Sequence, residues 1–398
     1  MPLSLPGVRA DAGPRTGPGT GPGAGPVTGP GTAEHPAFLR EQLITCLGNK
    51  RALLGPIAAA VDLVRERLDR DKLRILDAFS GSGVVSRLFK ASASHLVSND
   101  VESYARLVAE CFLTNSNEVQ WTALERVVKE INAEVEGAAS TEGFIERLYA
   151  PRDPDNITAD DRAFYTKENA RRLDAFRHLI GQAPAQLRPL LLGPLLSQAS
   201  VHANTAGVFK GFYKDRATKT GRFGGTRRDA LGRICKNITL EAPVLSRFEC
   251  TREVLQQDAN VLAGKIGGFD LAYLDPPYNQ HPYGANYFML NLLTDYQEPA
   301  RVSRVSGIPV EWNRSAYNVR GRALPALGEL LGALDAKFVL VSYNDEGFIR
   351  PPEMRELLAR LGTVHEVTTR YNTFRGSRNL AARALHVTEH LFLLDKRA

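Results

Sequence analysis

The segment that most constrains the fold runs from Leu73 to Asp100. The stretch "LRILDAFSGSG" is a short apolar strand that runs into a glycine-rich turn, a helical stretch follows, and "HLVSND" is a second strand that ends in an acid. Strand, glycine turn, helix, strand and acid in this order are typical of the opening of a doubly wound sheet. The later apolar stretches "GGFDLAYLD", "AKFVLVSYN" and "ALHVTEHLFLLD" add strands to it. The sequence therefore predicts an α/β fold with a Rossmann-like doubly wound sheet.

The glycine turn indicates what kind of ligand this sheet would bind. Gly81 and Gly83 permit a close backbone approach and positive φ angles where the strand turns into the helix. The pattern is not GxGxxG, and no Walker lysine follows it, so a pyrophosphate cradle is not supported. Asp77, at the strand end beside the turn, suits a cofactor whose amino-acid part carries an ammonium group. Asp100 ends the next strand, where a ribose-binding acid belongs. An ordinary α/β turn is the alternative interpretation.

The stretch "LAYLDPPYN", residues 271–279, carries the most specific chemistry. The apolar run before Asp275 is a buried-strand pattern, so this carboxylate falls at the strand edge where open α/β sheets bind ligands. Pro276 and Pro277 fix φ and remove backbone donors, which leaves outward carbonyls on a stiff frame. Tyr278 adds a flat aromatic ring. Two acceptors and a ring fit a planar amine, whereas a Pro-Pro turn that ends a strand is the structural alternative.

The positive charge of the chain is concentrated in residues 205–236. This window holds nine Lys and Arg residues against Asp215 and Asp229, a local charge of +7, while the whole chain has a net charge of +6. A basic, glycine-rich insert of this kind indicates a polyanion partner, although a solvated basic loop is the plainer interpretation. The residues that we expect to contact nucleic acid are Lys210, Lys214, Arg216, Lys219, Arg222, Arg227 and Arg228.

Composition and patterning divide the chain into three parts. Residues 1–36 are a Gly/Pro-rich tail that we expect to be disordered, because it cannot bury enough apolar surface to fold. Residues 37–135 and 240–398 form the predicted catalytic domain, and residues 136–239 form a helical and basic insert. No apolar run is long enough to cross a membrane, and no secretory signal is visible. Four widely spaced cysteines indicate neither a metal site nor disulfides, which fits the cytoplasm best.

Three stretches together resemble one enzyme family. "LDPPYN" is similar to the catalytic Asp-Pro-Pro-Tyr motif of amino-methyltransferases, and "LDAFSGSG" resembles their S-adenosylmethionine motif. "GNKRALL", residues 48–54, is similar to the N-terminal Gly-x-Lys element of Dam-like adenine-specific DNA methylases. The order of these elements along the chain is also that of the Dam-like (alpha) class of DNA N6-methyltransferases.

The resemblance implies a site-specific methyl transfer from S-adenosylmethionine to N6 of a flipped-out adenine in double-stranded DNA. It also implies that the helical and basic insert, residues 136–239, is the target-recognition region of a Rossmann-like methyltransferase. It implies that Lys50 and Asp77 hold the methionine end of the cofactor, and that Asp100 bonds the ribose. By position, Asp258 would meet the adenine amino group of the cofactor. The other cofactor-site residues that it implies are Phe79, Gly81 and Gly83, and the corner that would hold the target adenine consists of Asp275, Pro276, Pro277 and Tyr278.

Several alternatives stay open from the sequence. The target could be another planar amine, namely an RNA adenine, cytosine N4 or a protein glutamine side chain. A catalytically silent nucleic-acid-binding protein that kept the fold is the alternative from another class, against which the intact Asp275–Tyr278 motif speaks. The sequence also leaves open whether a companion restriction endonuclease exists or the methylation is an epigenetic mark.

Overall fold

The computed structural model describes residues 34–41, 43–45, 50–137, 143–225, 228–372 and 386–397. The predicted disordered tail, residues 1–36, lies outside these ranges except for Glu34–Pro36, so its disorder stays a prediction. Helix α1 (Pro36–Arg40) begins at the end of that tail. None of the helices in the described part of the chain is long and apolar enough to cross a membrane.

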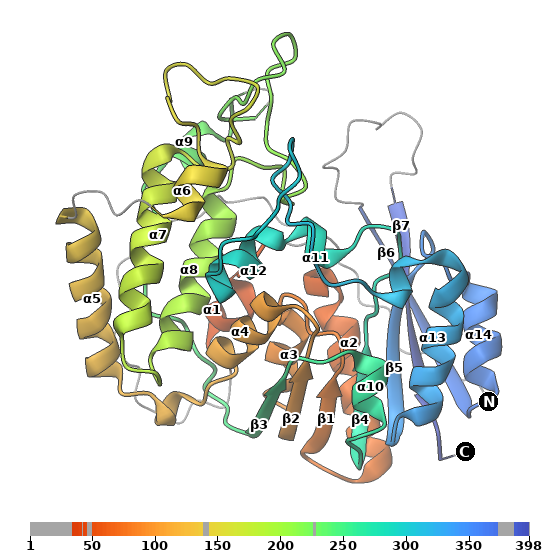
Figure 1. The fold of residues 1–398 in the computed structure, drawn as a ribbon. Helices are drawn as coiled ribbons and strands as arrows, with labels where there is room; N and C mark the ends of the chain where they lie inside the picture. The colour runs from red at the N-terminus through yellow and green to blue at the C-terminus, as the bar shows by residue number, and fades with distance from the viewer. Residues whose placement is uncertain are drawn as a thin grey trace. The chain divides into compact units, whose positions relative to one another are not determined.

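The described strands form one seven-stranded sheet in the order β3-β2-β1-β4-β5-β7-β6 (Figure 1). Its strands are β1 (Leu73–Asp77), β2 (Ala93–Asn99), β3 (Thr251–Leu255), β4 (Phe269–Leu274), β5 (Ala336–Asn344), β6 (Thr363–Asn372) and β7 (His386–Asp395). The pairs from β3 to β5 are parallel, and β7 runs antiparallel to both of its neighbours. This order confirms the doubly wound sheet that the sequence predicts.

The order of strands reverses between β1 and β4. From β1 the chain continues outward to β2 and β3, whereas β4 and β5 extend the sheet on the other side of β1. The last residue of β1, Asp77, pairs with Tyr273 near the end of β4. A crevice outside the carboxyl ends of the strands at such a reversal is where open α/β sheets bind ligands. The residues that follow β1 and β4 are therefore placed to share one site.

Alternating side chains of the strands divide the core of the sheet into two faces. Leu271 and Tyr273 of β4 pack into the core with helices α2 and α3, whereas Ala272 and Leu274 pack into the core with α13 and its neighbours. A strand whose side chains are buried on both faces is expected to be apolar along its length, and β4 is buried throughout and apolar except for Asp270. The helices of the two layers are α2 (Leu54–Leu68), α3 (Val84–Phe89), α10 (Ala259–Ala263), α13 (Arg320–Ala333) and α14 (Pro351–Ala359).

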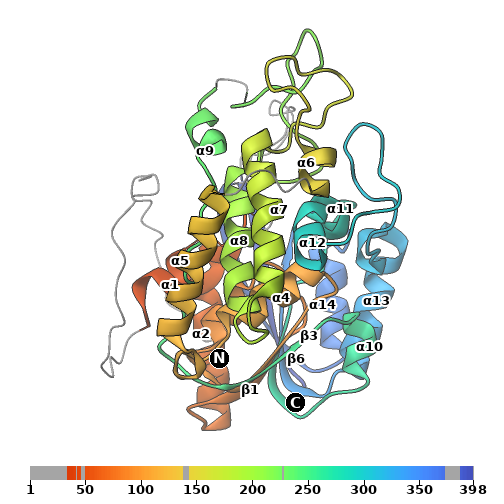
Figure 2. The same ribbon diagram turned by 60° about the vertical axis from the view of Figure 1, so that its left-hand side comes forward.

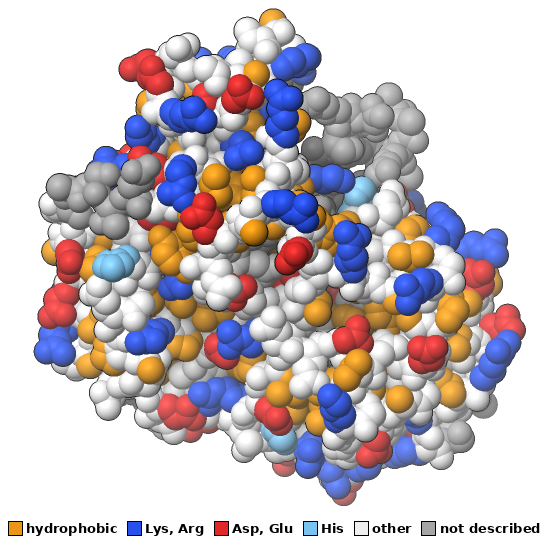
Figure 3. Space-filling view, in the orientation of Figure 1, with side chains coloured by type: hydrophobic (Ala, Val, Ile, Leu, Met, Phe, Trp, Pro, Cys, Tyr) orange, Lys and Arg blue, Asp and Glu red, His pale blue; other side chains and the backbone are white. Residues whose placement is uncertain are grey.

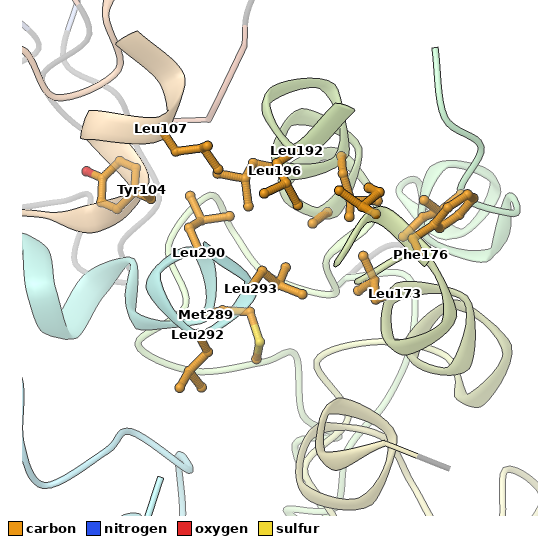
Figure 4. Packing of buried hydrophobic residues seen from close by; sticks show 14 of the residues in the cluster. Tyr104, Leu107, Leu173, Phe176, Leu192, Leu196, Met289, Leu290, Leu292 and Leu293 are labelled. Atoms are coloured by element: carbon orange, nitrogen blue, oxygen red, sulfur yellow. The ribbon is translucent and has the colours of Figure 1, made fainter. Parts of the chain in front are cut away.

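A third apolar core lies within a group of helices beside the sheet. Figure 2 shows α5, α7 and α8 of this group side by side, and Figure 4 shows Leu196 of α8 facing Leu290 of α12. Helix α8 approaches α4 closely at Gly193, where a Cβ atom would lie 2.5 Å from Sγ of Cys111. The helices of this layer are α4 (Ser103–Phe112), α5 (Trp121–Gly137), α6 (Phe144–Tyr149), α7 (Lys167–Gln182), α8 (Arg188–His202) and α12 (Phe288–Asp295).

The basic segment forms a hairpin rather than an open loop. Lys214 bridges Gly221 in antiparallel fashion, and we call residues 213–222 the basic hairpin. Buried Asn204 fixes its base: its side-chain amide donates to the carbonyls of Ala163 (2.8 Å) and Arg222 (3.1 Å). The remaining helical elements are η1 (Lys50–Leu53), η2 (Ser116–Glu118), α9 (Leu231–Cys235), α11 (Tyr283–Asn286) and η3 (Ala316–Asn318).

Candidate active site

One cavity lies at the carboxyl ends of β1, β2 and β4, at the reversal of the strand order. It is lined by most of the residues that the sequence singled out for catalysis and cofactor binding. These residues are Lys50, Asp77, Phe79, Gly81, Asp100, Asp258, Asp275 and Pro277. Three other predicted residues, Gly83, Pro276 and Tyr278, belong to the same turns but do not line the cavity. The roles assigned to all of these side chains stay predictions, whereas their convergence is a property of the fold.

Asp77 presents a buried acceptor to the cavity. Its Oδ2 accepts a hydrogen bond from the Ser86 hydroxyl at 2.6 Å. Its Oδ1 is buried and has no hydrogen-bond partner among the described residues. Burial raises the pKa of this carboxyl to about 7, against the lowering effect of the Ser86 hydrogen bond. A buried acceptor without a donor is costly, so a cationic or N–H group of a ligand would satisfy it.

The glycine turn has the conformation that the sequence predicts. Gly81 and Gly83 adopt φ angles of +51° and +72°, which only glycine adopts without strain. The backbone N–H of Gly81 donates to Oδ2 of Asp100 at 2.8 Å. The same carboxylate accepts from the N–H of Glu102 at 2.9 Å through Oδ1. Asp100 therefore ties the turn after β1 to the end of β2 and lines the cavity between them.

A small aromatic pair flanks the side of the cavity where Asp258 lies. Phe79 contacts Tyr317 edge to face, with ring centroids 5.4 Å apart. Asp258 caps α10, because its Oδ1 accepts from the backbone N–H groups of Asn260 and Val261. The Tyr317 hydroxyl donates to Oδ1 of Asn260 at 2.8 Å, which fixes the ring beside this cap. Sequence reasoning missed Tyr317, because nothing local distinguishes it from the other tyrosines.

The catalytic motif is held by a buried lysine. The Lys50 ammonium lies 3.0 Å from Oδ1 of Asp275 and 2.8 Å from Oε1 of Glu389, which is fully buried on β7. Burial alone would lower the Lys50 pKa, but the two carboxylates raise it well above its ordinary value. Burial raises the Asp275 pKa to about 6, although Lys50 acts in the opposite direction. The sequence predicted Lys50 as a cofactor ligand and did not predict this ion pair.

Tyr278 stands beside this ion pair. The Lys50 ammonium lies 5.8 Å from the centroid of its ring, and the ring contacts Tyr343 edge to face at 6.3 Å. The Phe348 N–H donates to the Tyr278 carbonyl at 2.8 Å, so the loop after β5 supports the motif from behind. Tyr278 is half-buried.

Glu102 is a further residue of the cavity that sequence reasoning missed. Its carboxylate accepts hydrogen bonds from the side-chain amides of Asn291 (2.6 Å) and Asn313 (3.2 Å). Burial raises its pKa to about 7, although the Asn291 hydrogen bond lowers it. The only local signal was a second acid two residues after Asp100. Glu102 connects the end of β2 to the segment that follows the catalytic motif.

The predicted nucleic-acid contacts lie on and beside the basic hairpin. Figure 3 shows Lys and Arg side chains gathered on the upper part of this face of the molecule, over the insert. Lys210, Arg216, Lys219 and Arg228 are exposed, whereas Lys214 and Arg222 are half-buried. Arg222 ion-pairs with Asp215 at 3.3 Å, which makes it partly a structural residue of the hairpin. Arg227 lies outside the described residues.

The described part of the chain contains no group of three or more His, Cys, Asp or Glu side chains placed to hold a metal ion.

The fold and the cavity define an α/β enzyme whose site pairs a cofactor turn after β1 with an Asp-Pro-Pro-Tyr corner after β4. Comparison with known proteins identifies the family. The model of the D12 class N6 adenine-specific DNA methyltransferases matches residues 47–356. The chain belongs to this family, which confirms the resemblance to adenine-specific DNA methylases, and it is a DNA adenine methyltransferase.

Individual relatives agree with this assignment. The type II methyltransferase M.NlaIII of Neisseria lactamica is 28% identical over 88% of this chain and 98% of its own length. The type II methyltransferase M.CviAII of Paramecium bursaria Chlorella virus 1 is 26% identical over 83% and 93%. M.FokI of Planomicrobium okeanokoites is 25% identical over 88% of this chain but only 52% of its own length.

Proposed function

We propose that this protein uses S-adenosylmethionine to methylate N6 of a flipped-out adenine within a specific DNA sequence. The observation that carries this proposal is that Asp77 and Asp275 line one cavity at the reversal of the sheet. A cofactor site and a site for a planar amine are thereby adjacent, as transfer of a group between two bound molecules requires.

The residues around the glycine turn fit S-adenosylmethionine. The unpartnered Oδ1 of Asp77 suits the ammonium group of the methionine part. Asp100 and Asp258 line the same cavity and would accept from the ribose and from the adenine amino group. Phe79 supplies an apolar surface for the base. When bound, this cofactor supplies an electrophilic methyl group on a sulfonium. The protein supplies binding and orientation.

The Asp-Pro-Pro-Tyr corner fits the target base. Asp275 and the carbonyl of Pro276 would accept the two N–H bonds of the adenine amino group, and Tyr278 would stack on the ring. Accepting both protons turns the nitrogen lone pair out of conjugation with the ring and raises its nucleophilicity. The negative charge of Asp275 also stabilises the positive charge that develops on N6. An adenine inside a duplex cannot reach this corner, so the base must leave the stack.

The helical and basic insert, residues 136–239, is the proposed target-recognition region, and the basic hairpin is the part of it that we expect to contact DNA. Its exposed cations, Arg216 and Lys219 among them, are suited to contact phosphates, which gives affinity without sequence information. Contacts to base edges in a groove would add the sequence specificity.

We propose a place in restriction and modification. Several relatives are named as type II methyltransferases, and one is a modification methylase of Lactococcus lactis. A companion restriction endonuclease that cleaves the same sequence is the partner that this proposal requires. With cellular DNA as its substrate, the protein would work in the cytoplasm.

The experiment that tests the proposed function uses cofactor with a labelled methyl group. The full chain is incubated with this cofactor and unmethylated duplex DNA, or with RNA of the same sequence. We expect transfer to DNA at one sequence context, and N6-methyladenine as the product. No transfer to DNA while DNA is still bound would show a silent binder, and transfer to RNA alone would overturn the choice of substrate.

A further inference from the structure

The inference concerns Glu389, a glutamate of strand β7 that directly precedes the residues "HLFLL". It is fully buried on β7, opposite Asn344 of β5. It lies outside residues 47–356, which the family model matches. Buried carboxylates are rare unless they are paired, because the loss of hydration costs several kcal/mol.

The partners of Glu389 connect it to the catalytic corner. Its Oε1 accepts a hydrogen bond from the Ser342 hydroxyl at 2.8 Å and lies 2.8 Å from the Lys50 ammonium. The same ammonium lies 3.0 Å from Oδ1 of Asp275. Lys50 is itself 3% exposed, so this is a buried cation shared between two carboxylates. The cluster connects η1, β4, β5 and β7, elements that are far apart in the sequence.

The charged groups that contact the Lys50 ammonium indicate what Glu389 contributes to the site. Lys50 and Asp275 alone would form a neutral pair, in which the lysine cancels the charge of the catalytic carboxylate. With Glu389 the cluster contains two carboxylates and one ammonium. Of the three side chains only Asp275 has notable exposure, at 19%, and it faces the cavity. Because Glu389 shares the Lys50 ammonium, this cation is not paired with Asp275 alone, and the carboxylate that faces the cavity retains negative charge where a positive charge develops on the amino nitrogen of the target.

We propose that Glu389 is a positioning residue for methyl transfer: it shares the Lys50 ammonium with Asp275, so that Lys50 orients Asp275 without being paired with this carboxylate alone. This inference rests on the proposed function, because it assigns Asp275 to the target amine. A role limited to stability is the competing interpretation. Buried ion pairs contribute little to stability on balance compared with apolar residues of the same volume, which argues against that role.

The first test is Glu389→Gln, which keeps the shape and removes the charge. We expect kcat to fall by about 10-fold or more, with the KM for cofactor and the affinity for DNA nearly unchanged. The matched control is Glu366→Gln on the neighbouring strand β6, where the carboxylate ion-pairs with Arg355 and with His390. We expect wild-type kcat from this control. Wild-type kcat in Glu389→Gln would overturn the inference.

A second test distinguishes a positioning role from a stabilising role by the direction in which kcat changes. Lys50→Met leaves Asp275 and Glu389 as neighbouring carboxylates without a cation. In that background Glu389→Gln removes the repulsion, so we expect kcat to rise or stay the same instead of falling. A residue that only stabilised the fold would lower kcat in both backgrounds, and that result would contradict the inference.

The pH profile gives an independent readout. Among the described residues, the charged and titratable groups around Asp275 are Lys50 on η1, Asp77 on β1, Tyr273 on β4, Tyr278 in the loop after β4, and Glu389 on β7. The charge of Glu389 raises the pKa of Asp275, so Glu389→Gln should move the acid limb of activity to lower pH. An unmoved limb would argue against the proposed coupling.

One further variant and the activity of the wild-type protein distinguish a failure of this inference from misfolding and from a failure of the proposed function. If Glu389→Gln does not fold, Ser342→Ala, which removes only the hydrogen bond to Oε1, should lower kcat about 2- to 5-fold by the same route. Unchanged kcat in folded Ser342→Ala would then overturn the inference. If the wild-type protein methylates no adenine, the proposed function fails. If it does methylate and the Glu389 variant equals it, only this inference fails.

Discussion

The Lys50 ammonium contacts Asp275 at 3.0 Å, so an element near the start of the folded chain orients the carboxylate of the catalytic motif. A lysine assigned from sequence to the cofactor therefore also contacts the Asp275–Tyr278 motif. Because both groups are buried, a change in the charge of one should shift the pKa of the other.

This electrostatic coupling predicts that the activity falls at acidic pH. The pKa values of Asp275 and Asp77 are raised to about 6 and about 7 by burial, and both carboxylates should be ionised for function. We expect kcat/KM for the cofactor, which reports groups of the free enzyme, to fall as the pH drops through this range. The measurement is the initial rate of transfer from pH 5 to 9 at fixed ionic strength. A profile that stayed flat to pH 5 would contradict the assignment of these two groups.

Asp77→Asn should weaken cofactor binding and stabilise the apo protein. The folded pKa of Asp77 lies above its ordinary value, so the cost of burying its charge is present above pH 7 and vanishes as the pH falls below 4. We therefore expect a gain on the order of 2 kcal/mol in unfolding free energy at pH 8 and little change at pH 4. Denaturant unfolding and titration calorimetry with S-adenosylmethionine measure the two effects.

The control for that variant is Ser86→Ala, which removes the hydrogen bond to Oδ2 but keeps the charge. Its cofactor affinity should fall less than that of Asp77→Asn. Equal affinities of wild-type protein and Asp77→Asn for the cofactor would rule out the proposed ammonium site.

The basic hairpin predicts a salt-dependent affinity for DNA. Arg216→Ala with Lys219→Ala should weaken binding to any duplex, and should reduce the slope of log affinity against log salt by about 1 for each phosphate that the variant no longer binds. The matched control removes Arg126 on α5 and Arg360 at the C-cap of α14, which form exposed ion pairs with glutamates four residues away. Fluorescence anisotropy at several salt concentrations measures both variants. Identical slopes for the two would move the DNA interface away from the hairpin.

The hydrogen bonds of Asn204 predict that a substitution at this residue destabilises the basic hairpin and leaves the cavity unchanged. Asn204→Ala removes the hydrogen bonds to Ala163 and Arg222 and leaves buried carbonyls unpaired, at a cost of about 1–3 kcal/mol. We expect weaker sequence discrimination with cofactor affinity unchanged, whereas exposed Asn237→Ala should behave as wild type. Unaltered discrimination in folded Asn204→Ala would separate the hairpin from target recognition.

Local patterns predicted much of this site because its residues follow strands. Asp77, Gly81 and Asp275 could be placed at one edge of the sheet, since parallel strands end on the same side. Glu389 and Tyr317 could not, because their roles come from contacts that only the folded chain creates. One signal was available for Glu389, namely an acid within the apolar run "HVTEHLFLL". The direction of β7, antiparallel in an otherwise parallel sheet, brings that acid to the active edge.

The central claim is that Asp275 holds the amino group of the target adenine. Nucleoside analysis by mass spectrometry, after single-turnover incubation of DNA with wild-type protein and with Asp275→Asn, tests it most directly. Asp270→Asn is the control, because this aspartate lies near the start of the same strand and ion-pairs with Arg70 and with Lys337. The account predicts that Asp275→Asn forms N6-methyladenine about 100-fold more slowly while binding cofactor, and that Asp270→Asn keeps its rate. N6-methyladenine formed at the wild-type rate by Asp275→Asn would contradict it.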